Sequence, residues 1–279
     1  MNILRLAAFS DGSVGGNPAG VVIGDELPLP REMQRVATEI GYSETVFAAR
    51  RAETWRVRYF SPATEVAFCG HATIALGAAL AIQQGEGVFS LSLNESDIFV
   101  EGKRQGALFS SSFQSPPTRS VRAPEDALEE VLDLFGLRPA DLDGRIPPAI
   151  AHAGANHLIL MLKARTTLAA MSYDFQRGKA LMVGRGWVTI LLGYSETARE
   201  FDVRNAFAYG GVYEDPATGA AAAALGGYLR DLRWPHSGRI ALRQGDDMGT
   251  PCRLIAEIDP TPAAPIRVSG TVRPLGEGF

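Results

Sequence analysis

Residues 65–80 read EVAFCGHATIALGAAL, and residues 214–229 read EDPATGAAAAALGGYL. At an offset of 149 residues (65 against 214), the two stretches agree without a gap at Glu, Gly, Ala, Ala, Leu, Gly and Leu. The Glu and the two glycines at fixed spacing carry the match, because alanine and leucine are common in this chain. Each copy is a polar turn that runs into a helix of small residues, and the first backbone N–H groups of a helix can bind an anion. The repeat therefore predicts two related half-domains that face one ligand.

The regions around the repeat predict many short strands. Period-two alternation and turn residues indicate them at 2–9, 21–23, 43–48, 55–60, 88–93, 98–100, 107–112, 157–162, 187–194, 200–203, 239–242, 253–257 and 266–272. Helices are indicated at 29–40, 70–84, 124–135, 167–172 and 218–232. Many strands around one small-residue helix per half predict an α+β fold of two pseudo-symmetric β-barrel-like half-domains, each enclosing a central helix.

The length of 279 residues allows two domains of ordinary size. The stretch 114–118 contains two prolines and is the expected linker between the halves. We therefore expect an N-terminal half-domain over residues 1–115, joined by the C-terminal strand 266–279, and a C-terminal half-domain over residues 116–265.

The composition excludes several classes of function. The chain has 27 basic and 31 acidic residues, a net charge of −4 and no basic run, so we expect no nucleic-acid partner. The apolar run 74–82 falls far short of the roughly 18 residues that cross a membrane, so no membrane association is expected. Two cysteines fit a reducing compartment, and the first residues lack a secretory pattern, so a cytoplasmic location is expected.

Three acidic residues lie at predicted strand or helix ends. Glu44 belongs to a predicted strand, where a carboxylate points either to solvent or into a cleft. Glu214 and Asp215 come directly before the second repeat helix, and Asp215 with Pro216 fits an N-cap followed by proline at the first helical position. Capping and catalysis are compatible, because a capping aspartate at a cleft also faces the ligand.

The cysteines and histidines favour neither a thiol mechanism nor a metal site. Cys69 and His71 are two residues apart at a strand-to-helix turn, where such side chains seldom meet in usable geometry. The four histidines include no pair at ligand spacing and no carboxylate completes a ligand set, so we expect no metal. No cofactor is expected either, because Gly184 and Gly186 lack the third glycine of a dinucleotide motif.

Five motifs, in order along the chain, resemble those of the PhzF family, the phenazine-biosynthesis isomerase-like proteins with a diaminopimelate epimerase-like fold. They are Gly16-Asn-Pro-Ala19, Met33-Gln34, Ser43-Glu-Thr-Val-Phe47, Cys69-Gly-His-Ala-Thr73 and Glu214-Asp-Pro-Ala-Thr-Gly219. The resemblance implies central helices whose N-termini face an interdomain cleft. It also implies a homodimer, and proton transfer at carbon without a cofactor.

The resemblance also implies roles for single residues. Glu44 matches the acid/base glutamate of the family, and His71 and Asp215 match polar partners that hold and protonate the substrate. Gly70 and Gly219 match the backbone donors at the two helix starts. The other expected substrate contacts are Asn17, Ser43, Thr218 and Ala220.

Two departures limit the chemistry that this resemblance implies. The family usually has Ser where this chain has Ala220, so a hydroxyl expected to touch the substrate or Glu44 is missing. That change weakens the case for the phenazine precursor as substrate. Related epimerases use one cysteine from each half as paired bases, whereas here Cys69 lies opposite Thr218 and Cys252 lies outside the repeat. A two-thiol racemase is therefore excluded.

The leading hypothesis is a cofactor-independent isomerase that acts on a small carboxylate-bearing substrate. Glu44 would remove a proton from an activated carbon, and Glu44 or Asp215 would return it elsewhere. One alternative is a two-base epimerase or racemase in which Glu44 and Asp215 act from opposite faces. The other is a non-catalytic ligand-binding protein on the same scaffold, which the loss of a hydroxyl at Ala220 favours.

Overall fold

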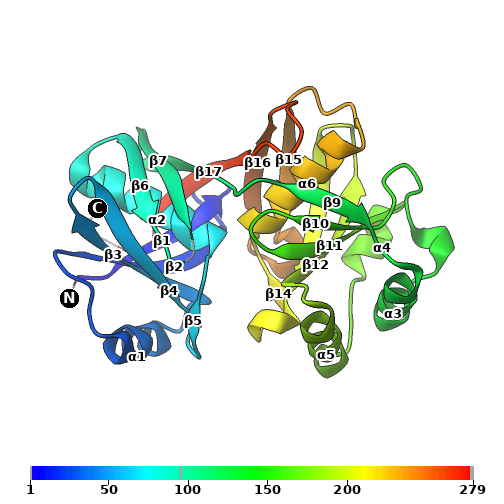
Figure 1. Cartoon of the computed structure of the whole chain (residues 1–279), viewed down its shortest axis with the longest axis horizontal. Coiled ribbons are helices and arrows are strands. Elements are labelled where there is room, and N and C mark those ends of the chain that lie inside the picture. The colour runs from blue at the N-terminus through cyan, green and yellow to red at the C-terminus, as the bar shows by residue number, and fades with distance from the viewer. Residues whose placement is uncertain (1, 95, 277–279) are drawn as a thin grey trace. The chain divides into compact units, whose positions relative to one another are not determined.

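Figure 1 shows the computed structural model of the chain, which describes residues 2–94 and 96–276. The chain divides into two compact units. Unit 1 comprises the described residues of Met1–Gln114, Thr250–Arg253 and Ser269–Phe279, and unit 2 comprises Ser115–Gly249 and Leu254–Val268. Strands β16 (Cys252–Ile258) and β17 (Ile266–Pro274) therefore contribute residues to both units.

Unit 1 is a ring of strands around one helix (Figure 1). Besides its share of β16 and β17, it contains β1 (Leu4–Ser10), β2 (Asn17–Gly24), α1 (Pro30–Ile40), β3 (Glu44–Arg51), β4 (Thr54–Phe60), β5 (Glu65–Val66), α2 (Gly70–Gln84), β6 (Gly87–Ser92), β7 (Asp97–Gln105) and β8 (Leu108–Gln114). The strands pair in the order β1-β2-β3-β4-β6-β7-β8, and β17 pairs with both β8 and β1. Helix α2 contacts six of these strands and lies inside the ring.

The sequence of α2 explains why it lies in the interior. Every residue from Gly70 to Ala81 is buried, and only His71 and Thr73 among them have polar side chains. A helix that is apolar on all sides is stable when other elements surround it. Its small residues let the strands approach closely: a Cβ at Gly102 in β7 would lie 2.0 Å from the carbonyl oxygen of Gly77 in α2.

Unit 2 places its own central helix, α6 (Gly219–Asp231), among strands in the same way. Its other elements are β9 (Arg119–Arg122), α3 (Glu125–Phe135), β10 (Ala149–His152), β11 (Asn156–Leu162), α4 (Arg165–Ala169), α5 (Phe175–Arg185), β12 (Thr189–Ser195), β13 (Glu200–Ala206), β14 (Glu214–Asp215) and β15 (Arg239–Gln244), with 3-10 turns at Pro139–Asp141, Ala208–Gly210 and Asp246–Met248. Helix α6 contacts β9, β10 and β11 on one side. On another side, the side chains of Ile258 and Ile266 lie against Gly226.

The two units repeat one order of strand pairings. Antiparallel β1–β2, parallel β2–β3, antiparallel β3–β4 and parallel β4–β6 in unit 1 correspond to β10–β11, β11–β12, β12–β13 and β13–β15 in unit 2. The two-residue strands match as well, since Phe60 pairs with Glu65 and Ala206 pairs with Glu214. The predicted α+β fold, with a central helix in each of two β-barrel-like half-domains, is confirmed.

Further helices cover the outer faces of the strands. In unit 1, Met33 and Val36 of α1 pack with Val22, Phe47 and Phe60. In unit 2, a larger apolar cluster joins α3 and α5 to the strands, with Leu132, Met182 and Trp187 among its buried members.

The elements of unit 2 that the sequence patterns missed include β9, β10 and α5. Strands β9 and β10 contain four residues each, and helix α5 contains two glycines. Gly178 in α5 is required by packing, because a Cβ there would lie 2.6 Å from Cε2 of Tyr173. Within the described residues, none of the helices is both long enough and apolar enough to span a membrane.

Candidate active site

In unit 1, Glu44 and His71 lie together at the N-terminal end of α2. Glu44 is the first residue of β3 and is 6% exposed, and His71 is the second residue of α2 and is 3% exposed. The carboxylate oxygen Oε2 of Glu44 lies 3.4 Å from Nε2 of His71. The hydroxyl of Ser43 lies 3.3 Å from the same nitrogen. The Glu44 carboxylate and the Ser43 hydroxyl therefore both contact one nitrogen of a buried imidazole.

Cys69 contacts the other nitrogen of the His71 imidazole, contrary to the expectation from sequence. Its sulfur lies 3.3 Å from Nδ1 of His71 and 4.0 Å from Nε2. The expectation that these side chains do not meet was wrong because Cys69 is extended at the N-cap (φ −141°, ψ 116°), which turns its side chain toward the first helical turn. Thiol, imidazole and carboxylate thus form one buried cluster.

The backbone of Cys69 is held in place by buried hydrogen bonds. The hydroxyl of Thr73 donates to the Cys69 carbonyl oxygen at 2.7 Å, and the Thr73 N–H donates to it at 3.0 Å. The hydroxyl of Tyr59 lies 2.7 Å from that of Thr73. Burial raises the pKa of Tyr59, so this phenol stays neutral at physiological pH.

The cluster also corrects the expectation that no carboxylate completes a metal-ligand set. One donor atom each from Glu44, Cys69 and His71 lie within 4.8 Å of one another, and all three residues are buried. The sequence spacing hid this grouping, because Glu44 comes from a strand 25 residues before Cys69. Oxygen, nitrogen and sulfur donors of this kind can hold a transition-metal ion.

The other predicted residues of unit 1 lie near the same end of the sheet. Asn17 is buried and opens β2, two residues before Ala19, the register partner of Glu44. Gly70 is the first residue of α2, and none of the described side chains caps that helix. The first N–H groups of an α-helix have no partner within the helix, so those of α2 remain available to an anion.

In unit 2, Asp215 and Thr218 form a turn before α6. The Thr218 hydroxyl donates to Oδ2 of Asp215 at 2.7 Å, and α6 begins one residue later at Gly219. Asp215 therefore does not cap this helix next to Pro216, as the sequence suggested, because it belongs to β14 and the N-cap position is Thr218. Asp215 is 7% exposed, and Gly219 is buried beside the half-buried Ala220.

Gln244 fixes this turn and was not found by sequence reasoning. Its Nε2 donates to the Asp215 carbonyl oxygen at 2.6 Å and to the Thr218 hydroxyl at 3.1 Å. Its Oε1 accepts from the Thr218 N–H at 3.1 Å. Gln244 is 1% exposed and lies at the end of β15, 26 residues after Thr218, so no local pattern indicated it.

The glutamates that anchor the sequence repeat have a structural role. Arg58 binds Glu65 through Nε at 2.7 Å and Nη2 at 2.5 Å, and Arg204 binds Glu214 through the same two atoms at 2.9 and 2.5 Å. The hydrogen bond from Arg58 lowers the pKa of Glu65, and the hydrogen bond that Arg204 donates to Glu214 raises the pKa of Arg204. Each repeat glutamate thus ties a two-residue strand to its neighbour.

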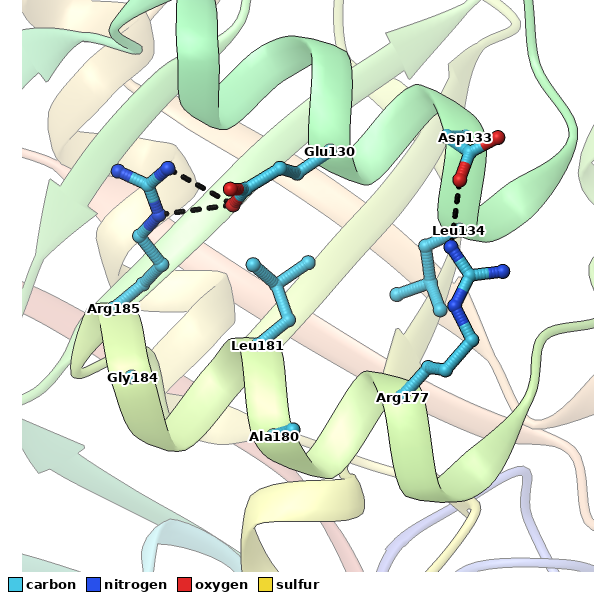
Figure 2. Close-up of a pocket in the computed structure, with 8 residues that line it drawn as sticks. All are labelled: Glu130, Asp133, Leu134, Arg177, Ala180, Leu181, Gly184 and Arg185. Carbon is cyan, nitrogen blue, oxygen red and sulfur yellow. Dashed lines mark hydrogen bonds and ion pairs between the residues drawn. The ribbon is translucent and has the colours of Figure 1, made fainter.

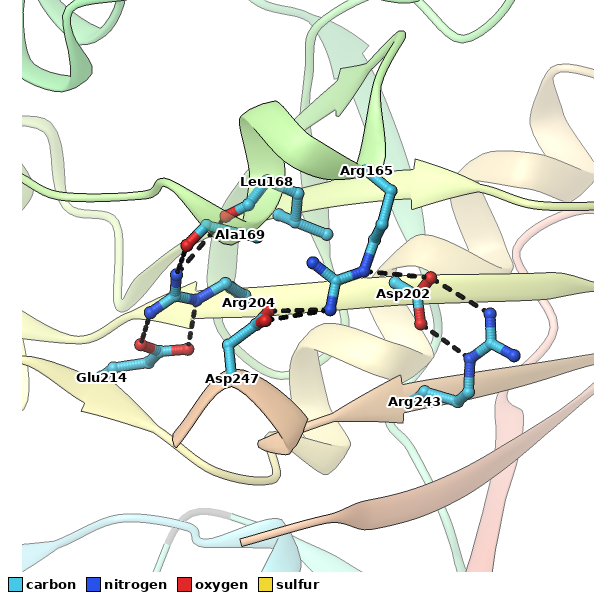
Figure 3. Close-up of polar contacts among 8 residues, drawn as sticks. All are labelled: Arg165, Leu168, Ala169, Asp202, Arg204, Glu214, Arg243 and Asp247. Carbon is cyan, nitrogen blue, oxygen red and sulfur yellow. Dashed lines mark hydrogen bonds and ion pairs between the residues drawn. The ribbon is translucent and has the colours of Figure 1, made fainter. Parts of the chain in front are cut away.

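The unit 2 pair is part of a wider network of arginines and carboxylates (Figure 3). Arg204 also donates to the carbonyl oxygen of Ala169 at 2.8 Å. Arg165 binds Asp247 and Asp202 in the same region. These contacts connect α4 to β13 and β14 and support the strand that carries Asp215.

A surface hollow in unit 2 is lined by none of the predicted site residues. A surface pocket of about 500 Å³ lies between α3 and α5, lined by Leu134 and Leu181 and flanked by the ion pairs Arg177–Asp133 and Arg185–Glu130 (Figure 2). Its charged groups are already paired with one another. Among the described residues that line it, every acid is already paired with an arginine, so we place a candidate site in each unit instead, at the start of α2 and at the start of α6.

Comparison with known proteins gives matches over most of the chain. A family model described as "Phenazine biosynthesis-like protein" matches residues 6–277. An uncharacterized isomerase of Deinococcus radiodurans is 31% identical over 264 residues, with 91% of this chain and 86% of the relative covered. The trans-2,3-dihydro-3-hydroxyanthranilate isomerase of Pseudomonas fluorescens is 27% identical over 263 residues, covering 92% and 90%. The crystal structure of a Bacillus anthracis phenazine biosynthesis protein of the PhzF family superposes with a TM-score of 0.84 at 22% identity, covering 98% and 96%.

Proposed function

Since the chain belongs to the phenazine biosynthesis-like (PhzF) family and is an isomerase, we propose that it moves a proton between carbon atoms of a small carboxylate-bearing substrate without a cofactor. The observation that carries this proposal is the buried pair of Glu44 and His71 at the start of α2. Both groups can exchange protons with a bound molecule, and both lie beside the N–H groups at the start of a helix.

Glu44 is the proposed base. Within the described part of the chain, its carboxylate meets one ionisable partner, His71, at a distance longer than a good hydrogen bond. A buried carboxylate with so few contacts retains lone pairs that can accept a proton from a substrate carbon.

His71 is the proposed acid that supports Glu44. Its two nitrogens contact different groups, with Cys69 at Nδ1 and with Glu44 and Ser43 at Nε2. An N–H at Nε2 can donate to the carboxylate or to a substrate oxygen. The N–H groups at the start of α2, including that of Gly70, would bind the substrate carboxylate or the negative charge that develops when the proton leaves.

Asp215 is proposed as the second proton-transferring group, and Thr218, Gly219, Ala220 and Asn17 as further substrate contacts. The support for Asp215 is its place before α6, where Thr218 and Gln244 hold both its side chain and its backbone. A carboxylate with a fixed orientation is suited to return a proton at one defined position.

The proposed substrate class rests on the anion-binding N–H groups at the helix starts and on the name of one relative. The Pseudomonas fluorescens relative acts, by its name, on a dihydrohydroxyanthranilate, which is a small cyclic carboxylate. Ala220 provides no hydroxyl to such a substrate, so we propose a carboxylate of the same size with a different polar substituent.

Proton exchange with solvent tests the proposal directly. A panel of small unsaturated carboxylates, with trans-2,3-dihydro-3-hydroxyanthranilate included, is first screened for ligands that raise the melting temperature. Each hit is then incubated with the protein in deuterium oxide and followed by NMR. We expect deuterium at a carbon next to a shifted double bond. Inversion at one stereocentre would indicate an epimerase instead, and stabilisation without any exchange would indicate a binding protein.

The family resemblance also supports a cytoplasmic homodimer. Light scattering after size-exclusion chromatography measures the mass of the assembly directly. A mass near twice 29.8 kDa is expected, and a mass near 29.8 kDa would contradict the dimer.

A further inference from the structure

Glu44, Cys69 and His71 together make a donor set that proton transfer alone does not require. Proton transfer by the proposed mechanism uses Glu44 and His71, whereas the sulfur of Cys69 adds a soft donor 3.3 Å from the imidazole. A carboxylate, an imidazole and a thiolate are all common zinc ligands, and three protein ligands leave one coordination position open. We propose that these three residues bind one Zn²⁺ ion reversibly and that the bound ion blocks proton transfer at Glu44.

The distances within the cluster are close to those that a shared ion requires. A tetrahedral zinc ion with bonds of about 2.0–2.3 Å holds its ligand atoms about 3.3–3.8 Å apart. Nε2 of His71 is already 3.4 Å from the Glu44 carboxylate, and Sγ of Cys69 is 4.0 Å from the same nitrogen. Binding through Nε2 therefore requires the Cys69 side chain or the imidazole ring to reorient, because the sulfur now lies closer to Nδ1 than to Nε2.

Burial and the surrounding contacts favour the ion. All three residues are buried, so a divalent cation would neutralise the charges of a carboxylate and a thiolate that water does not solvate. The loop that carries Cys69 is held through its carbonyl oxygen by Thr73, which in turn contacts Tyr59. Such outer contacts keep ligand-bearing groups in position and strengthen metal binding.

Metal binding at this cluster has a chemical signature that can be measured. The Cys69 thiol must lose its proton to bind zinc, so binding releases a proton and the affinity rises with pH. A bound ion also occupies the lone pairs that Glu44 needs as a base. The inhibitory half of the inference therefore rests on the proposed function, whereas the binding half does not.

Calorimetric titration with Zn²⁺ tests the binding half. The variants are Cys69→Ser and, as a matched control, Cys252→Ser, which removes the other buried cysteine. We expect one ion per chain in the wild type and in Cys252→Ser, and an affinity at least about tenfold weaker in Cys69→Ser. Absence of saturable binding, or equal affinities for the wild type and Cys69→Ser, would overturn the inference.

Cobalt and a thiol reagent provide readouts that remain valid if Cys69→Ser folds poorly. Co²⁺ is expected to produce a thiolate-to-metal absorption band in the near ultraviolet with Cys252→Ser, whose remaining cysteine is Cys69. Zn²⁺ should also slow alkylation of Cys69 in that variant. A missing band together with unchanged alkylation would contradict binding through sulfur.

The inhibitory half is tested on the wild-type protein with the substrate that shows deuterium exchange. We expect exchange to fall as zinc saturates the site and to recover when a chelator is added. Zinc binding at Cys69 with undiminished exchange would refute the blocking role and leave the binding site standing. Lack of exchange by the metal-free protein with every carboxylate would instead count against the proposed function.

Discussion

The carboxylate of Glu44 and the imidazole of His71 lie 3.4 Å apart, with the first residue 6% exposed and the second 3% exposed. Glu44 is the first residue of β3 and His71 is the second residue of α2, so two rigid elements set this distance. In a site with little water, a charge on either group is felt strongly by the other and by a bound substrate. The pair is therefore suited to a proton transfer that also places charge near the N-terminus of the helix.

Removing one partner of the Arg204–Glu214 pair should destabilise the protein strongly. Their side chains are 10% and 4% exposed, so Glu214→Gln leaves a guanidinium buried without its counter-charge. We expect a loss of about 3–5 kcal/mol in the free energy of unfolding, measured in urea. The double variant Arg204→Met/Glu214→Leu should recover much of that loss. A single variant as stable as the wild type would contradict the structural role given to the repeat glutamate.

Gly102→Ala should prevent β7 from packing against the central helix. The added Cβ would lie 2.0 Å from the carbonyl oxygen of Gly77, and backbone atoms cannot move aside cheaply. We expect a loss of more than about 3 kcal/mol in stability. The matched control is Gly184→Ala in α5, where a Cβ meets nothing within 4 Å, and it should be neutral or stabilising by up to about 1 kcal/mol. Equal effects at the two positions would contradict the close approach.

His157 should make the protein less stable as the pH falls. Burial lowers the pKa of His157 from 6.5 to about 3, so between these values the unfolded chain binds a proton that the folded protein does not. Stability from this group is therefore complete above pH 6.5 and is lost as the pH decreases toward 3. From pH 7 to 5 the wild type should lose about 2 kcal/mol more than His157→Gln, measured by urea unfolding at each pH.

A parallel decline of the wild type and His157→Gln would show that the imidazole is not held neutral. The imidazole bonds to the Thr189 hydroxyl at 2.8 Å through Nδ1, and glutamine can keep a contact with that hydroxyl. NMR titration of the His157 ring in the wild type provides the same information without a substitution.

The fold could be predicted because the sequence patterns that indicate its helices and strands are local. The repeat at 65–80 and 214–229 marks both central helices, and their runs of alanine and glycine predict burial by strands. Strand alternation gave most of the remaining elements. Helix α5 was not predicted because it contains Gly178, a residue that disfavours helices. Contact with Tyr173 requires that glycine, and helical periodicity does not reveal such a tertiary requirement.

The contacts within the candidate site were less predictable. The distance between Cys69 and His71 depends on the extended backbone of Cys69, and the support of Asp215 depends on Gln244 in a later strand. Motif resemblance named Glu44, His71 and Asp215, but it did not indicate the thiol beside the imidazole. The sequence assigned no role to the repeat glutamates Glu65 and Glu214 beyond their match, and their bidentate arginines identify them as structural.

The rate of solvent deuterium exchange in Glu44→Gln tests the central claim most directly. Glutamine keeps the shape of the side chain but cannot accept a proton, and Glu53→Gln, at an exposed turn residue after the same strand, is the matched control. We predict that Glu44→Gln lowers exchange into the substrate by about 10²–10⁴-fold while Glu53→Gln retains the wild-type rate. Exchange by Glu44→Gln at the wild-type rate would contradict the assignment of Glu44 as the base.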